Sequence, residues 1–308
     1  MRIVVMGSGG TGGYFGAKLA RAGEDVTFVA RGEHLDAIRK HGLRVNSAPE
    51  GEWVVRSPAV EKLDGQPPAD VILFCVKSYD TESAGEVIKP VVGPGTGVLP
   101  VQNGVDNEEK LARILGPGHV MGGIAQVLAT IESPGVIRHQ FLGRIVFGEM
   151  DGRESERARA FLRACEAAGI SAEISPNMLR TLWEKYVFIT AQAGMTALTR
   201  CPAGVIRTVP ETRRLYRLIL EEMVALGRAA GAGLEPGFVD TCLGMLDNLG
   251  ATFYSSLHYD LTHGKRLELE ALHGHAVRLG ERFGLATPML FAVYAALSPY
   301  RDGAPVAG

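Results

Sequence analysis

Apolar residues stand in short, nearly unbroken runs over the first third of the chain. Residues 3–6, 26–30 and 71–76 form three such runs, which is the pattern of strands in a parallel sheet that is covered on both faces. Between the first two runs, residues 14–21 carry a helical pattern that stops near Gly23, and glycine commonly ends helices. The pattern therefore predicts a βαβ unit at the start of a doubly wound sheet.

The next segments predict the rest of a first domain. A run at 98–102 ends at Asn103 and predicts another strand. Residues 120–149 form short, glycine-interrupted runs around a turn at 133–135, which predicts an antiparallel edge to the sheet. A helix and a last strand are expected over 154–168 and 170–174.

After this point every pattern is helical. Apolar residues recur at helical spacing over 181–190, 211–230, 236–246, 265–283 and 288–297. The predicted fold is α/β, with a Rossmann-type doubly wound parallel sheet over residues 1–175 and an all-α domain over 176–308. A length of 308 residues suits two domains.

Composition narrows the class of protein. A hydrophobic content of 46% supports real cores, and a net charge of −2 without a basic stripe argues against a nucleic-acid partner. No secretory signal and no run of membrane-spanning length is visible. The four cysteines lack CxxC spacing, which favours free thiols in a reducing compartment. We expect a cytoplasmic protein that acts on a small molecule, and whether it is a monomer or a homodimer stays open.

A glycine loop follows the first strand. Glycines at 7, 9 and 12 match the dinucleotide fingerprint, in which they allow a tight turn, close approach of the pyrophosphate, and packing of helix on strand. The loop comprises Gly7, Ser8, Gly9, Gly10, Thr11 and Gly12. Arg31 stands 19 residues after Gly12, where an acid would bind the ribose of NAD and an arginine can pair with the 2′-phosphate of NADP. The alternatives are a plain turn and a solvated charge.

Polar residues mark two further strand ends. Lys77 and Asn103 each follow an apolar run, and ligands of open α/β sheets bind outside the carboxyl ends of the strands. We therefore expect both to face the same crevice as the glycine loop, although ordinary loop residues would give the same pattern. In the helical half, Lys185 interrupts an apolar helix, and residues 255–268 are dense in hydrogen-bonding groups.

Histidines in the second half of the chain raise the alternative of a metal site. They lack tight spacing combined with a nearby cysteine, which favours surface or core histidines and no metal. The residues concerned are His258, His263, His273 and His275.

With these motifs in order, the chain resembles the ketopantoate reductase family (2-dehydropantoate 2-reductase). The shared marks are the glycine loop, the strand-end lysine, the Gln-Asn-Gly turn, a Trp-x-Lys helix and a segment from a serine to a glutamate. The resemblance implies a C-terminal domain like that of 6-phosphogluconate dehydrogenase, and reduction of ketopantoate to (R)-pantoate by NADPH on the way to pantothenate and coenzyme A.

The resemblance also implies residue roles. Lys185, protonated at neutral pH, would be the catalytic acid, Glu268 would orient it and contact the cofactor, and Ser256 would bind the substrate carboxylate. Asn103 would contact both substrate and cofactor, and Lys77 would lie at the cofactor. Without the resemblance, Lys185 would be a lysine at a pocket rim, and Ser256 and Glu268 would be exposed helix residues.

One departure bears on the substrate. Ile189 and Ala193 occupy positions where many members of the family carry asparagines that contact the polar end of the substrate. Thr190, Gln192 or residues of the last helices are the candidates to replace them. The departure leaves two alternatives open, namely a related 2-oxoacid reductase with a less polar substrate, and a non-catalytic NADP-binding sensor.

Overall fold

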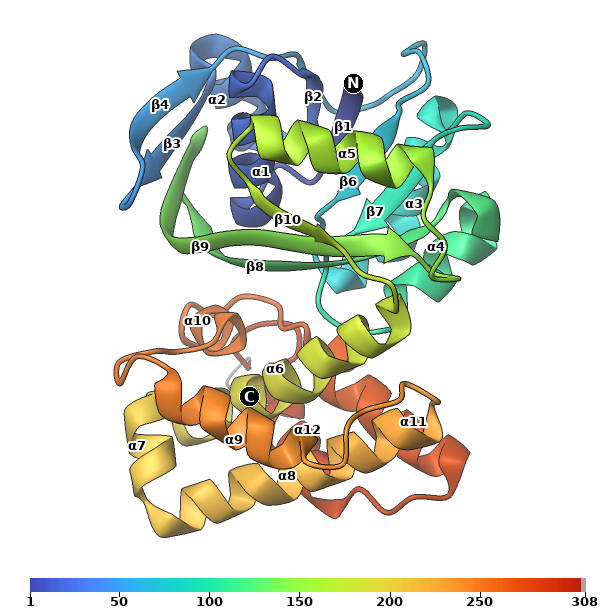
Figure 1. Ribbon diagram of the computed structural model, residues 1–308. Coiled ribbons are helices and arrows are strands. Elements are labelled where there is room, and N and C mark those ends of the chain that lie inside the picture. Colours follow the sequence, from blue (N-terminus) through green and yellow to red (C-terminus); the bar gives the residue numbers. More distant parts are fainter. Residues whose placement is uncertain (306–308) are drawn as a thin grey trace. The chain divides into compact units, whose positions relative to one another are not determined.

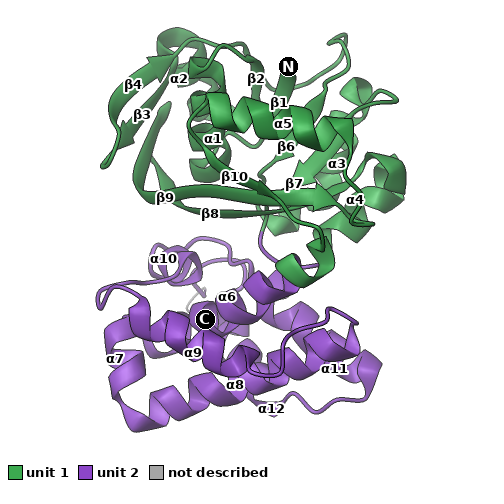
Figure 2. Ribbon diagram, in the orientation of Figure 1, with its two compact units in different colours: residues 1–102, 106–181 green, residues 103–105, 182–308 purple. Residues whose placement is uncertain are grey.

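The computed structural model describes residues 1–305 and divides into two compact units (Figures 1 and 2). Unit 1 comprises Met1–Gln102 and Asp106–Thr181, and unit 2 comprises Asn103–Val105 and the chain from Leu182 onward. The change from strand to helix predicted near residue 175 falls just before α6 (Met178–Thr199), whose first turn belongs to unit 1.

Unit 1 contains the predicted parallel sheet, in the order β5-β2-β1-β6-β7. Its strands are β1 (Arg2–Met6), β2 (Asp25–Val29), β5 (Ala59–Val60), β6 (Val71–Phe74) and β7 (Gly97–Pro100), and all neighbours are parallel. The strand order reverses between β1 and β6, because the chain first builds to one side of β1 and then to the other. Such a switch point is where open α/β sheets bind ligands.

Helices cover both faces of this sheet. Alternate residues of a strand point to opposite faces, so Ile3 and Val5 join the core that also contains α1 (Gly10–Arg21). Val4 and Met6 join the other core, which contains residues of α3 (Thr81–Ile88) and α4 (Asn107–Leu115). The doubly wound prediction is confirmed.

A second sheet lies on the outer side of α1, which contacts strands of both sheets. Its order is β10-β9-β3-β4, with β8 paired to β9. The strands are β3 (Leu43–Ser47), β4 (Gly51–Val55), β8 (Met121–Ser133), β9 (Val136–Glu149) and β10 (Ser171–Ile174). The antiparallel pairing of β8 and β9 is confirmed. Their expected place at the edge of the parallel sheet is confirmed only by one isolated bridge, between Val98 of β7 and Val120. Otherwise they belong to the second sheet, because β9 pairs in parallel with β3, a strand that the sequence reasoning missed.

Two more helices complete unit 1. The sequence predicted α5 (Glu156–Ala167) within two residues at each end, and Ser155 caps it by accepting a hydrogen bond from the Ala158 amide. Helix α2 (Gly32–His41) follows β2 directly, so its first turn lies beside the carboxyl end of the parallel sheet.

Unit 2 is all-helical over its described residues, as predicted. Its helices after α6 are α7 (Ala203–Thr208), α8 (Pro210–Ala229), α9 (Phe238–Asn248), α10 (Ser256–Thr262), α11 (His275–Phe283) and α12 (Pro288–Leu297). Its core is one large cluster, in which Tyr186, Tyr216 and Cys242 are completely buried. The helix expected over 265–283 is confirmed only from residue 269. A π-helical turn, Glu270–Gly274, precedes α11, and residues 265–267 are not helical.

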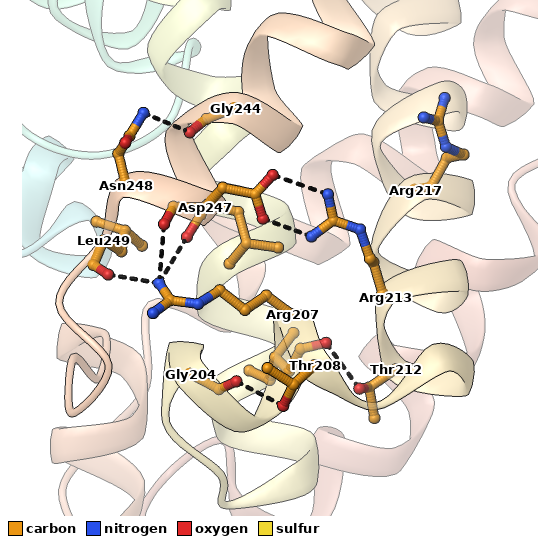
Figure 3. A network of polar contacts seen from close by, with 12 residues as sticks. Gly204, Arg207, Thr208, Thr212, Arg213, Arg217, Gly244, Asp247, Asn248 and Leu249 are labelled. Atoms are coloured by element: carbon orange, nitrogen blue, oxygen red, sulfur yellow. Dashed lines mark hydrogen bonds and ion pairs between the residues drawn. The ribbon is translucent and has the colours of Figure 1, made fainter.

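An arginine fixes the end of α9 (Figure 3). The Arg207 guanidinium donates to the carbonyl oxygens of Asp247 at 3.0 Å and Leu249 at 2.6 Å. A helix leaves its last four carbonyls without partners in the helix, so Arg207 supplies the missing donor. Arg213 forms a two-point ion pair with the Asp247 carboxylate on the same turn. These contacts hold the start of the connection from α9 to α10, which carries Ser256.

Candidate active site

The glycine turn after β1 has the shape that a dinucleotide requires. Gly7 has a φ of +94°, a backbone conformation that other residues rarely adopt. A Cβ atom on Gly12 would lie 2.2 Å from the Gly7 carbonyl oxygen, so the helix can start close to the turn only with glycine there. A Cβ atom on Gly9 would meet no described atom within 4 Å. The fold therefore does not require glycine at position 9, whereas a pyrophosphate that approaches this backbone would.

Two other residues of the loop have contacts within the protein. A Cβ atom on Gly10 would lie 2.0 Å from the Ala129 carbonyl oxygen, so the absence of a side chain lets β8 pack against the start of α1. The Ser8 hydroxyl is buried and donates to the Val29 carbonyl at 3.0 Å, which ties the loop to the end of β2. Thr11 lies in the first turn of α1 and is half-buried.

His34 supports the same loop and was missed by the sequence reasoning. Its Nε2 atom lies 2.8 Å from the Ser8 carbonyl oxygen, and its Nδ1 atom accepts a hydrogen bond from the Gly135 amide at 3.0 Å. An accepting Nδ1 makes Nε2 the protonated nitrogen of a neutral ring. Burial lowers the pKa of His34, against an opposing effect of the Ser8 carbonyl. Nothing in the local sequence distinguishes this histidine, because Gly135 is a hundred residues away.

Arg31 lies where the motif places the residue that reads the ribose. It immediately precedes α2, and its side chain is 82% exposed. One guanidinium nitrogen contacts the Asp80 carboxylate at 3.1 Å. An ion pair this exposed contributes little stability, so it holds the guanidinium loosely at the carboxyl end of β2.

The other predicted strand-end residues lie next to a buried polar network. Lys77 follows β6 by three residues and is half-buried. The Gln102 amide donates to the Thr81 hydroxyl at 2.8 Å, and that hydroxyl lies 3.0 Å from the Asn107 side-chain oxygen. The network anchors the Gln-Asn-Gly turn from the side of unit 1. Asn103, the next residue, is half-buried and belongs to unit 2.

The remaining predicted residues all belong to unit 2. Lys185 lies on α6 and is half-buried. Glu268 is 7% exposed and stands just before the π-turn, so it is not the exposed helix residue of the alternative. Ser256 is the first residue of α10 and is exposed, while its neighbour Ser255 caps the helix and bonds the Thr196 hydroxyl at 2.6 Å.

Along α6, one side chain stands out near the positions that depart from the family pattern. At 100° per residue, Gln192 lies within about 20° of Lys185 on the helix surface. Its amide nitrogen and oxygen are both buried and form no hydrogen bond with any residue in 1–305. Ala193 is buried, and Ile189 is half-buried against the apolar core. A buried unpaired amide is costly, so Gln192 is the candidate, on the face of Lys185, for a contact with the polar end of a substrate.

Two other kinds of site are absent from residues 1–305. These residues contain no group of three or more histidine, cysteine or acidic residues that could hold a metal ion. No helix among them is both long enough and apolar enough to cross a membrane.

Comparison with known proteins assigns the family. The model of the family described as ketopantoate reductase PanE/ApbA matches residues 3–152, and the model of its C-terminal part matches residues 177–301. The chain belongs to the ketopantoate reductase family. It is thus an oxidoreductase of that family, and the two matched regions contain every residue predicted for the site.

Individual relatives cover nearly the whole chain. A 2-dehydropantoate 2-reductase of Archaeoglobus fulgidus is 33% identical, with 92% of each chain covered. An uncharacterized oxidoreductase, YkpB, of Bacillus subtilis is 30% identical over 97% of this chain and 99% of its own. The crystal structure of a PanE/ApbA family ketopantoate reductase from Ralstonia eutropha has a TM-score of 0.90 and 31% identity, with 98% of both chains covered.

Proposed function

We propose that this family member is an NADPH-dependent reductase that converts 2-dehydropantoate to (R)-pantoate in the synthesis of pantothenate and coenzyme A. The observation that carries the proposal is the presence of Lys185 on the helix after the sheet domain, in a chain that matches both family regions. The shape of the Gly9 turn supports a dinucleotide, and the exposed Arg31 supports NADP. A cytoplasmic location stays a prediction.

The residues of unit 1 would hold the cofactor. The amides at the start of α1 and the open space at Gly9 suit a pyrophosphate, because a helix N-terminus attracts anions. Arg31 can form charge-assisted hydrogen bonds to a 2′-phosphate. Lys77 would add positive charge at the carboxyl end of β6. When bound, a reduced nicotinamide supplies the hydride.

The residues of unit 2 would act on the 2-oxo acid. The Lys185 ammonium would attract the 2-oxo group and donate a proton to its oxygen as the carbonyl is reduced. The buried Glu268 carboxylate would orient that ammonium and contact the cofactor. Ser256, exposed at the start of α10, would bind the substrate carboxylate, and Asn103 would position substrate and cofactor.

A specific observation favours a second candidate. Ile189 and Ala193 present apolar surface where amides are common in the family, and such a surface suits a 2-oxo acid with a less polar side chain. Both candidates use Lys185 as the acid and differ only in the side chain of the 2-oxo acid that they bind, so one experiment separates them.

The test is NADPH oxidation with ketopantoate and a panel of branched 2-oxo acids, comparing kcat/KM. The proposal expects ketopantoate to be reduced fastest, and replacement of Lys185 by alanine to lower turnover roughly 10²- to 10⁴-fold. Lys89→Ala is the matched control, because Lys89 is exposed and paired with Glu86 on the surface of unit 1. Preference for an apolar acid would select the second candidate. Wild-type turnover in the Lys185 variant would refute the role of Lys185 as the acid. No reduction of any acid by the wild-type protein would favour a sensor.

A further inference from the structure

The connection between Glu268 and α11 is unusual. His275 donates its amide hydrogen to the Glu270 carbonyl, five residues back, which makes Glu270–Gly274 a π-helical turn. Such turns hold one residue more than an α-helical turn, are rare, and often occur at functional sites. This one lies two residues after Glu268, within a single compact unit that also contains Lys185.

A tyrosine on α6 bonds this turn. Tyr186 follows Lys185 and is completely buried, and its hydroxyl donates to the Leu272 carbonyl at 2.5 Å. The Leu272 amide in turn donates to the Glu268 carbonyl at 3.2 Å. A continuous path of one covalent step and two hydrogen bonds thus runs from Lys185 to Glu268.

Two aromatic side chains lie beside the buried Tyr186 ring. It packs edge-to-face on Trp183 with ring centres 5.4 Å apart, and His275 lies at 6.4 Å. Because the ring is completely buried, its hydroxyl has little freedom to move, and the bond to Leu272 therefore restrains the turn.

A second contact lies further along α6. A Cβ atom on Gly194 would lie 2.4 Å from the His273 Nε2 atom, so the absence of a side chain lets His273 pack directly on the helix. Tyr186 and Gly194 are eight residues apart, which is about 12 Å along a helix. Two contacts at that separation fix both the sliding and the rotation of the turn against α6.

We infer that Tyr186 is a positioning residue, whose hydroxyl sets the place of Glu268 relative to Lys185 through the π-turn. The inference rests on the proposed function, in which these two residues act on substrate and cofactor. A misplacement of about 1 Å in such a pair can cost orders of magnitude in rate, whereas the apolar core around the ring would tolerate phenylalanine.

The experiment is a double-mutant cycle with Tyr186→Phe and Glu268→Gln, measured as kcat and KM for the best 2-oxo acid. We expect Tyr186→Phe alone to lower kcat roughly 10-fold, with KM within about 2-fold. In the Glu268→Gln background the same change should lower kcat by less than about 2-fold, because a residue that acts through Glu268 has nothing left to position.

The matched control is Tyr216→Phe. Tyr216 is also completely buried in the core of unit 2, and its hydroxyl has no hydrogen-bond partner among the described residues. Its removal should leave kcat unchanged. Gly194→Ala, which presses on His273 from the other contact, should lower kcat in the same direction as Tyr186→Phe, and thermal melting shows that each variant is folded.

Two results would overturn the inference. An equal loss in both backgrounds would show that the Tyr186 hydroxyl acts independently of Glu268, and unchanged kcat in folded Tyr186→Phe would show that it does not act at all. A wild-type protein that reduces no 2-oxo acid would instead reject the proposed function, and the positioning role with it.

Discussion

His273 should make the stability of unit 2 depend on pH. Its side chain is completely buried, and burial lowers its pKa from 6.5 to about 4, against an opposing effect of the Thr190 backbone. The folded state thus binds a proton less readily than the unfolded state. The stabilising contribution is present above pH 6.5, is lost progressively as the pH falls from 6.5 to 4, and is fully lost below 4.

The magnitude follows from the two pKa values. A difference of 2.5 units, from 6.5 to about 4, corresponds to about 3 kcal/mol in total, at about 1.4 kcal/mol per unit. Lowering the pH from about 7.5 to about 5 crosses part of this range and should cost about 2 kcal/mol of unfolding free energy.

The assay uses the two tryptophans of the chain, one in each unit. Trp53 lies on β4 of unit 1 and Trp183 lies on α6 in unit 2. In a Trp53→Phe background, urea unfolding followed by fluorescence therefore reports on unit 2. The measurement compares this parent with the same protein carrying His273→Leu, at both pH values.

The prediction concerns the difference between the two proteins. Other groups with shifted pKa values, including His258, contribute equally to both and cancel. The loss between the two pH values should be about 2 kcal/mol smaller in the leucine variant. Equal losses in the two proteins would show that His273 is not the group that takes up the proton.

Three further predictions concern ligands. Gly9→Ala should abolish dinucleotide binding at unchanged melting temperature, because only a ligand needs the space at Gly9, whereas Gly12→Ala should lower the melting temperature as well. Calorimetry and titration with NADPH distinguish the two variants. Normal NADPH binding by the Gly9 variant would contradict the placement of the pyrophosphate at this turn. Arg31→Ala should weaken the binding of NADPH about 10-fold or more and leave the binding of NADH unchanged, as expected for charge-assisted bonds to a 2′-phosphate. Equal weakening of both would show that Arg31 does not recognise the 2′-phosphate. Gln192→Met should reduce the preference for ketopantoate over its analogue without the hydroxyl by roughly 10-fold in kcat/KM, with Tyr216→Phe in the buried core of unit 2 as control; an unchanged ratio would exclude Gln192 as the group that binds the hydroxyl.

Short-range sequence patterns predicted those elements of the fold that depend only on neighbouring residues. The runs that became β1 and β6 are almost entirely buried, so composition alone marked them, and the positive φ of Gly7 agrees with the turn predicted from the sequence. The second sheet could not be placed in this way, because the partner of β9 is a strand ninety residues earlier. Pairing over such a distance leaves no trace in the period of either strand.

The candidate site divides along the same line. Motif residues such as Lys185 and Glu268 were named from the sequence, and their roles stay predictions. The groups that support the glycine loop and the segment around Glu268 were not predicted from the sequence. His34 contacts the glycine loop through bonds to Ser8 and to a residue a hundred positions away. Tyr186 had the apolar environment of an ordinary core tyrosine, and only the carbonyl it meets gives it a further role.

The π-turn also makes the position of Glu268 depend on the number of residues between it and α11. An α-helix turns by about 100° per residue, so deleting one residue within 270–274 would restore an unbroken helix and swing everything before it by that angle. Glu268 would then leave the side on which the Tyr186 contact holds it, although no side chain of the site had been replaced. Among relatives, a gap of a single residue in this stretch is therefore a more serious difference than many substitutions around it.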